Sequence, residues 1–195
     1  MKKYVAEAFG TGVLTLVVGA SLAGSSPVST PVLAALTLGL FVYSLGHVSG
    51  THINPAVTAG LWSIGKISAP EAGKYMIGQF AGAIVALICL QTWFAMPAAA
   101  ALAFDFKVGL AELLGTAIFT FGIASVVYGR TPGMMSGVVV GGSLLLGIAL
   151  AASFGSLGVL NPAVALGLQV INITYVLGPV LGAIVGMRLY HALAK

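Results

Sequence analysis

Long apolar runs dominate the chain, separated by short segments that contain Gly, Pro, Ser or charged residues. A helix needs about 20 apolar residues to cross a bilayer. Six runs approach or exceed that length, and they cover residues 4–24, 31–49, 73–96, 107–128, 133–154 and 173–192. The pattern therefore predicts an all-α integral membrane protein with six transmembrane helices.

Two shorter apolar segments, 55–64 and 162–171, follow the second and the fifth run. Each is roughly half as long as a helix that crosses a bilayer. Both begin with the same four residues, Asn-Pro-Ala-Val, at Asn54 and at Asn161. We expect two half-helices with identical starts.

Composition supports a membrane protein. The chain is 59% hydrophobic and only 6% charged, with a mean hydropathy of +1.10. This is too little charge to solvate the surface of a soluble globule. The net charge of +4 comes from eight scattered Lys and Arg residues, which does not resemble a nucleic-acid-binding patch. The single Cys89 can form no disulfide within the chain.

The first apolar run has one alternative interpretation. Lys2 and Lys3 before an apolar run are also typical of a secretory signal. Glu7 interrupts that run, and the segment recurs later in the chain, which favours a mature membrane helix. With this end in the cytoplasm, seven of the eight basic residues fall on the cytoplasmic side and only Lys107 falls outside. Both termini are therefore expected to be cytoplasmic, in a plasma or inner membrane.

The two halves of the chain resemble each other. The segment Ala6-Glu7-Ala8-Phe9-Gly10-Thr11 matches Ala111-Glu112-Leu113-Leu114-Gly115-Thr116, and Asn54 matches Asn161. The repeats cover about 1–100 and 105–195 of a single membrane domain, 1–195. Each repeat contains three crossings, an odd number, so the second copy must be inverted in the membrane. The two half-helices would then enter from opposite faces and meet near the midplane.

The residues at each half-helix start define its chemistry. Asparagine is a good N-cap, and proline suits the first helical position because no N–H is lost. The small alanine lets the two starts approach closely. The residues expected to form the meeting point of the two half-helices are Asn54, Pro55, Ala56, Asn161, Pro162 and Ala163. Each asparagine amide would keep an NH₂ group free to donate a hydrogen bond to a solute.

The segments before each asparagine must be extended backbone at membrane depth, which requires a watery cavity or burial in protein. Their carbonyl oxygens predict a track for a neutral solute that can donate and accept hydrogen bonds. The converging positive helix ends would repel cations and protons. The expected pore-lining backbone is Gly50, Thr51, His52, Ile53, Val159 and Leu160.

These features resemble the aquaporin and aquaglyceroporin family, also called the major intrinsic proteins. The segment "GHVSGTHINPAVT" and the paired "AEAFGT" and "AELLGT" carry the resemblance, which extends over essentially the whole chain. It implies six tilted helices plus two half-helices, a homotetramer with one pore per subunit, and a channel for water or small neutral solutes rather than an enzyme. No cofactor or metal is implied.

The resemblance also suggests roles for buried charges. Glu7 and Glu112 would accept hydrogen bonds that hold the two non-helical segments, although Glu7 could instead lie at the cytoplasmic interface. His47 is expected to be packed and hydrogen-bonded as part of the scaffold that holds these segments, and His52 to belong to the loop at the pore mouth. Two histidines without a carboxylate or thiol nearby make a poor metal site.

The chain departs from the family at the outer filter. Most members have an arginine directly after the second Asn-Pro-Ala, whereas this chain has Val164. Family spacing places the other filter positions at Ala34, Ala149 and Gly158, with a possible shift of one residue on either helix. We expect a wide, apolar filter that passes glycerol- or urea-like solutes as well as water. A secondary transporter and a non-conducting structural member of the family remain alternatives.

Overall fold

The computed structural model describes residues 1–24, 26–94 and 103–194, and no strand occurs among them. The helices in chain order are α1 (Lys2–Ala23), α2 (Thr30–Ser49), α3 (Pro55–Ser63), α4 (Ala69–Trp93), α5 (Phe106–Val127), the 3₁₀ helix η1 (Gly133–Met135), α6 (Ser136–Ser153), α7 (Pro162–Gly167) and α8 (Ile173–Leu193). Six helical segments in the described part are long and apolar enough to cross a membrane, the fifth being Gly133–Ser153. The predicted all-α membrane fold is confirmed.

The long helices begin and end within a few residues of the predicted bounds. The half-helix α3 ends at Ser63. The prediction of a helix over 162–171 is wrong, because α7 ends at Gly167. Gln169 adopts a left-handed backbone with φ of 60° and ends the helical path. The end of the predicted repeat 1–100 lies outside the described residues.

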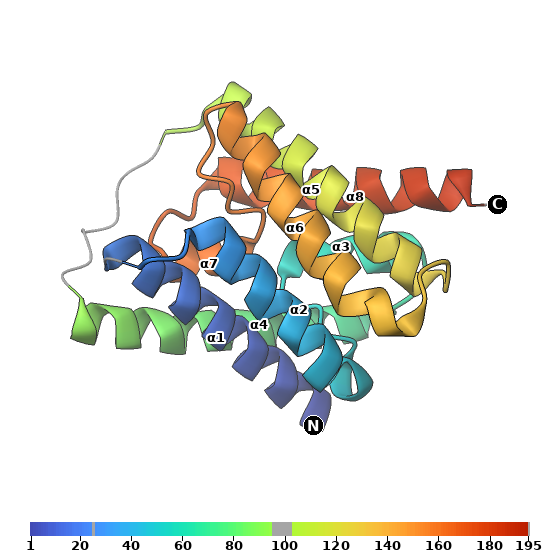
Figure 1. Cartoon of the computed structure of the whole chain (residues 1–195), viewed down its shortest axis with the longest axis horizontal. Helices are drawn as coiled ribbons and strands as arrows, with labels where there is room; N and C mark the ends of the chain where they lie inside the picture. The colour runs from blue at the N-terminus through green and yellow to red at the C-terminus, as the bar shows by residue number, and fades with distance from the viewer. Residues whose placement is uncertain (25, 95–102, 195) are drawn as a thin grey trace.

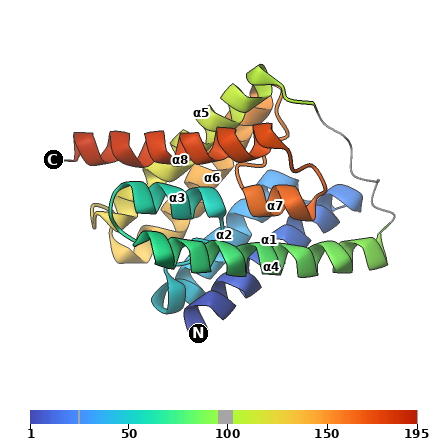
Figure 2. The same cartoon turned by 180° about the vertical axis from the view of Figure 1, so that it is seen from behind.

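The two halves of the chain pack in the same way. In the first half α1 packs against α2 and α4, and in the second half α5 packs against α6 and α8. The short helices cross between the halves, because α3 packs mainly on α8 and α7 packs mainly on α4. A contact between α2 and α6 joins the halves directly. Figures 1 and 2 show α3 and α7 as two short helices among the long ones.

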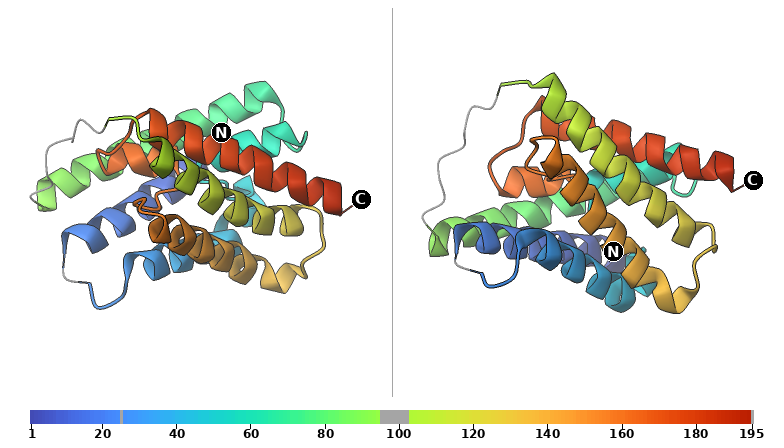
Figure 3. Two further views of the ribbon diagram at one scale, coloured as in Figure 1. Left: turned by 90° about the horizontal axis from the view of Figure 1, so that it is seen from above. Right: turned by 45° about the horizontal axis from the view of Figure 1, so that its top comes forward.

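Glycine allows the closest helix crossings. A Cβ atom added at Gly82 of α4 would collide with the carbonyl oxygen of Ala8 in α1. At the corresponding crossing in the second half, a Cβ atom at Gly182 of α8 would collide with the carbonyl oxygen of Leu113 in α5. The long helices therefore cross backbone to backbone at an angle, as the tilted views in Figure 3 show.

Candidate functional site: two facing half-helices at the end of an apolar cavity

Asn54 and Asn161 cap the two half-helices with their side chains. Asn54 Oδ1 accepts a hydrogen bond from the Ala56 amide at 2.8 Å. Asn161 Oδ1 accepts from the Ala163 amide at 3.0 Å and from the Val164 amide at 3.3 Å. Each cap satisfies amide groups that a helix start leaves without a partner.

The same two side chains tie the half-helices to each other. Asn54 Nδ2 donates to the Leu160 carbonyl at 2.9 Å, and Asn161 Nδ2 donates to the Ile53 carbonyl at 3.0 Å. Each asparagine thus bonds the residue that precedes the other asparagine. The expectation of an entirely free NH₂ group is corrected, since one of its two hydrogens is used. The second hydrogen of each group makes no hydrogen bond within the described residues.

The segments before the asparagines have strained backbones. Thr51, Ile53 and Leu160 have positive φ values of 52°, 39° and 53°, which are unusual for residues other than glycine. Such conformations persist only where the surroundings hold them in place.

Glu7 and Glu112 supply that support. Glu7 accepts hydrogen bonds from the backbone amides of His52 at 2.9 Å and Ile53 at 2.6 Å. Glu112 accepts from the backbone amides of Val159 at 2.9 Å and Leu160 at 2.7 Å. Both carboxyl groups are fully buried. Each helix that opens a repeat therefore fixes the non-helical segment of its own repeat.

Sequence reasoning missed the polar residues that complete these networks. The Ser49 hydroxyl donates to Glu7 at 2.7 Å, and the Ser156 hydroxyl donates to Glu112. Gln79 donates to Glu7 at 2.8 Å and to Thr58 at 3.0 Å. An internal comparison could have found the serines, because Ser49 and Ser156 are related by the same offset as Asn54 and Asn161 (107 residues, 161 − 54).

The prediction for His47 is wrong. Its side chain is exposed on α2 and makes no hydrogen bond to the described part of the chain. It lies on the outer face of α2, whereas Ser49, two residues later, turns inward to Glu7. Ser49 therefore has the role that was expected of His47.

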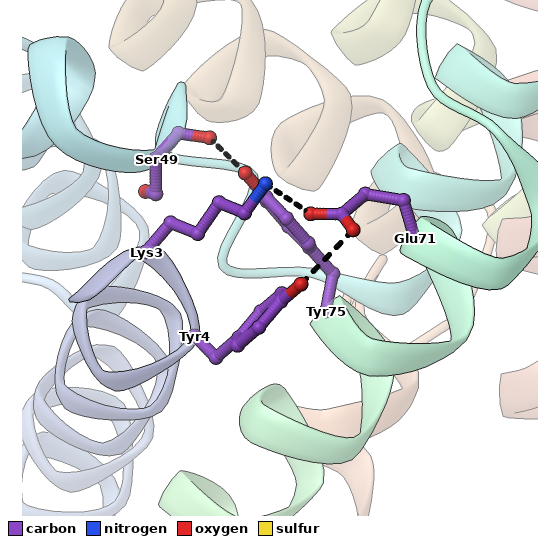
Figure 4. A network of polar contacts seen from close by, with 5 residues as sticks. All are labelled: Lys3, Tyr4, Ser49, Glu71 and Tyr75. Atoms are coloured by element: carbon purple, nitrogen blue, oxygen red, sulfur yellow. Dashed lines mark hydrogen bonds and ion pairs between the residues drawn. The ribbon is translucent and has the colours of Figure 1, made fainter. Parts of the chain in front are cut away.

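A second polar network joins the starts of α1 and α4 (Figure 4). Lys3 Nζ lies 2.5 Å from Glu71 Oε1, and the Tyr4 hydroxyl donates to Glu71 Oε2 at 2.9 Å. The Tyr75 hydroxyl donates to the Ser49 carbonyl at 2.8 Å, at the end of α2. The Tyr75 ring lies 4.7 Å from the His52 ring, centroid to centroid. This network connects the N-terminal end of the bundle to the segment before Asn54.

A cavity of about 600 Å³, which we call the main cavity, leads to the paired asparagines. Asn54, Asn161, His52 and Ile53 line its inner part, and Leu22, Ala23, Thr30, Pro31, Phe94 and Val170 lie where α1 and α4 end and α2 begins. The main cavity therefore extends from the asparagines to the end of the bundle opposite the N-terminus.

Three of the four predicted filter residues, Ala34, Gly158 and Val164, line the main cavity. The fourth prediction is wrong, since Ala149 is exposed on the outer face of α6 and Ile148 lines the cavity instead. A Cβ atom added at Gly158 would lie 3.1 Å from Cγ2 of Ile148, so these two residues are close neighbours. Ala34, Ile148, Gly158 and Val164 thus line one cavity, and the α6 residue among them is bulkier than alanine.

The predicted backbone track is only partly exposed. His52, Ile53 and Val159 line the main cavity, but Gly50, Thr51 and Leu160 do not. Leu160 packs its side chain beside Gly115 and Gly147 and gives its carbonyl to Asn54. The last carbonyl of each segment therefore accepts a hydrogen bond from the opposite asparagine.

His52 lies between two hollows. It lines the main cavity and also a smaller hollow of about 440 Å³ near Lys3, Lys66 and Glu71. Its Nδ1 atom is 3.1 Å from the Thr58 hydroxyl. Within the described residues, no group of three or more His, Cys, Asp or Glu side chains is placed to hold a metal ion.

Comparisons with known proteins agree with this geometry. A family model described as "Major intrinsic protein" matches residues 1–190. The chain is 34% identical to a probable aquaporin AqpM of Archaeoglobus fulgidus over 83% of its length and 74% of the relative. It is 32% identical to an aquaporin Z of Bradyrhizobium diazoefficiens over 75% of its length and 71% of that protein. The X-ray structure of the aquaglyceroporin from Plasmodium falciparum superimposes with a TM-score of 0.68 at 23% identity, covering 98% of this chain and 94% of that one.

Proposed function

The chain belongs to the major intrinsic protein family, which includes the aquaporins and aquaglyceroporins, and on this premise we propose that its paired asparagines exclude ions from the pore. Members of this family are channels and not enzymes. The chain is a multi-pass integral membrane protein and a passive channel for water or small neutral solutes. The proposals below concern how it selects among them.

The reciprocal bonding of Asn54 and Asn161 carries the proposal for ion exclusion. The two half-helix starts face each other at the inner end of the main cavity. Each start contributes about half a positive charge, which counts strongly where water is scarce. Each asparagine also offers one remaining N–H to a passing solute. A neutral molecule gains a hydrogen bond there, whereas a cation or a hydrated proton meets repulsion.

The filter residues have no charge to add to this barrier. Ala34, Ile148, Gly158 and Val164 supply no polar side-chain atom. In this proposal, ion exclusion depends on the two half-helix starts at Asn54 and Asn161 rather than on the filter. We expect the filter to sort neutral solutes by size and hydration.

A Val164→Arg substitution tests the position of the filter. The added guanidinium would narrow and charge the main cavity beside Gly158. Flux of glycerol and urea should fall severalfold more than flux of water, measured by stopped-flow light scattering on proteoliposomes. An equal loss for water and for the larger solutes would mean that Val164 is not at the constriction.

The burial and the hydrogen bonds of the two carboxyl groups argue against a proton-coupled transporter. Such a protein needs an ionisable group that can reach the solute path. Glu7 and Glu112 are fully buried and bond the backbone segments before the asparagines. A proton gradient that drives solute accumulation in proteoliposomes would favour the transporter, and strictly downhill flux favours the channel. A non-conducting member of the family would raise no flux above that of empty liposomes.

The distribution of basic residues supports an orientation. Lys2, Lys3 and Lys66 lie at the end of the bundle where α1 begins and α3 has ended. Positive residues favour the cytoplasmic side. We propose that both termini lie on the cytoplasmic side of a cell membrane and that the main cavity opens to the outside.

Assembly as a homotetramer with one pore per subunit is part of the proposal. Every long helix keeps large exposed apolar side chains, among them Leu36, Val85 and Leu146. Lipid and neighbouring subunits can share these faces. Native mass spectrometry from mild detergent should give a mass of four chains, and a monomer alone would contradict the assembly.

A further inference from the structure

We propose that this channel conducts neutral solutes that carry a hydrocarbon part faster than solutes of similar size that are polar at every position. The inference rests on the proposed function, because it concerns the solute class that the main cavity admits. It goes beyond a wide filter, since width alone would favour the smaller solute.

The walls of the main cavity are hydrocarbon over most of their extent. The long helices contribute Leu14, Val18, Leu38, Phe119, Leu144 and Ile148. These residues come from α1, α2, α5 and α6, so the apolar surface surrounds the path on several sides. A solute inside the cavity is therefore in contact mainly with side chains that can form no hydrogen bond.

Hydrogen-bonding groups are few and unevenly placed. Among the described lining residues, polar side chains occur at Thr30 near the mouth and at His52, Asn54 and Asn161 at the inner end. Between these levels the lining offers the backbone of Gly158 and Val159. Their amides are already used, by the Ser156 hydroxyl at 3.1 Å and by Glu112 at 2.9 Å. At filter level a solute meets carbonyl acceptors on one side and hydrocarbon on the others.

This arrangement penalises a fully polar solute. A hydroxyl or amide group that leaves water without a replacement bond loses free energy, whereas a methyl group gains free energy on entering apolar surroundings. Transfer of one methyl group into such surroundings is worth roughly two- to fourfold in partition. Selectivity at Ile148 and Val164 would then follow the cost of dehydration rather than the number of hydrogen bonds made.

The experiment compares urea with N-methylurea, and glycerol with propane-1,2-diol, in proteoliposomes by stopped-flow light scattering. The flux of empty liposomes is subtracted for each solute, and water flux is recorded on the same preparation. We expect the channel-mediated ratio of N-methylurea to urea to exceed one, by roughly two- to fourfold. A ratio below one would overturn the inference.

Two substitutions test the residues named. Val164→Thr and Ile148→Thr place a hydroxyl in the filter with little or modest change in size, and each should lower the N-methylurea to urea ratio about twofold or more. Val85→Thr is the matched control, because Val85 is exposed on the outer face of α4. A filter variant whose ratio equals that of Val85→Thr would contradict the assignment.

The outcomes separate this inference from the proposed function. If no solute, water included, crosses faster than in empty liposomes, the channel itself is refuted. If solutes cross but urea outruns N-methylurea, the channel holds and the inference fails.

Discussion

At the scale of single residues, the buried carboxyl groups decide how the pore is built. Glu112 lies on α5, yet its partners are the amides of Val159 and Leu160 in a segment that is not itself helical. Leu160 needs that support because its φ of 53° is unfavourable for a side chain with a Cβ atom. The carboxyl group thus stabilises the position of Asn161.

A Glu112→Gln substitution should destabilise the protein measurably. Glutamine has one acceptor oxygen and an NH₂ group, so at least one backbone amide would lose its partner at a fully buried site. The expected loss is about 1–3 kcal/mol of unfolding free energy. Thermal unfolding in detergent would show it as a lowered midpoint.

Glu71→Gln is the matched control for that experiment. Glu71 is partly exposed and pairs with Lys3 at the membrane surface, where solvent weakens the pair. The control should unfold close to the wild-type temperature. Equal shifts for both variants would refute the supporting role of Glu112.

At the scale of helices, tight crossings set the spacing of the bundle. The main cavity lies between α1, α2, α5 and α6, and of these helices α1 packs on α4 and α5 packs on α8. Gly82 lets α4 touch the backbone of α1 at Ala8. A side chain there would push both helices apart, because the obstructing atom belongs to the backbone.

Gly82→Ala should therefore destabilise the fold by about 1–3 kcal/mol, the usual cost of overpacking a tight site. Gly142→Ala on α6 is the control, since a Cβ atom at Gly142 has no neighbour within 4 Å. Alanine favours a helix over glycine, so the control should be neutral or slightly stabilising. The measurement is the thermal unfolding midpoint of each variant in the same detergent. Similar midpoints for the two variants would contradict a close crossing of α1 and α4 at Gly82.

The helices also explain which parts of the site the sequence could predict. The starts of α3 and α7 were predictable because Asn and Pro act locally as caps. The rotation of α6 was not, since the helix is apolar on every side and no polar stripe marks its inner face. For this reason the sequence pointed to Ala149, whereas Ile148 is the α6 residue that lines the main cavity. The prediction that His47 is packed and hydrogen-bonded was wrong for a related reason. The residue type alone does not show which face of α2 the histidine occupies.

Hydrogen bonds between residues far apart in the sequence were also not predictable. Gln79 lies on α4 and reaches Glu7 on α1, 72 positions earlier in the chain. Its partner depends on the crossing at Gly82, which a single sequence does not reveal. In the second half the matched position is Pro179, so internal comparison gives no signal for it.

At the scale of the whole molecule, the duplicated unit produces one pore from two incomplete parts. α3 of the first half packs on α8 of the second, and α7 of the second packs on α4 of the first. Each asparagine caps the half-helix of its own repeat and donates a hydrogen bond to the other repeat. Neither half contains both donors, so in the proposed mechanism neither half could exclude ions alone.

The central claim is that this chain conducts neutral molecules while its paired asparagines hold back protons. The most direct measurement records water flux by light scattering and proton flux by an entrapped pH-sensitive dye, on the same proteoliposomes. We expect water flux well above that of empty liposomes, together with proton flux equal to theirs. Proton flux that rises along with water flux would show that the paired asparagines do not exclude protons, and an absence of water flux would show that the chain is not a water channel.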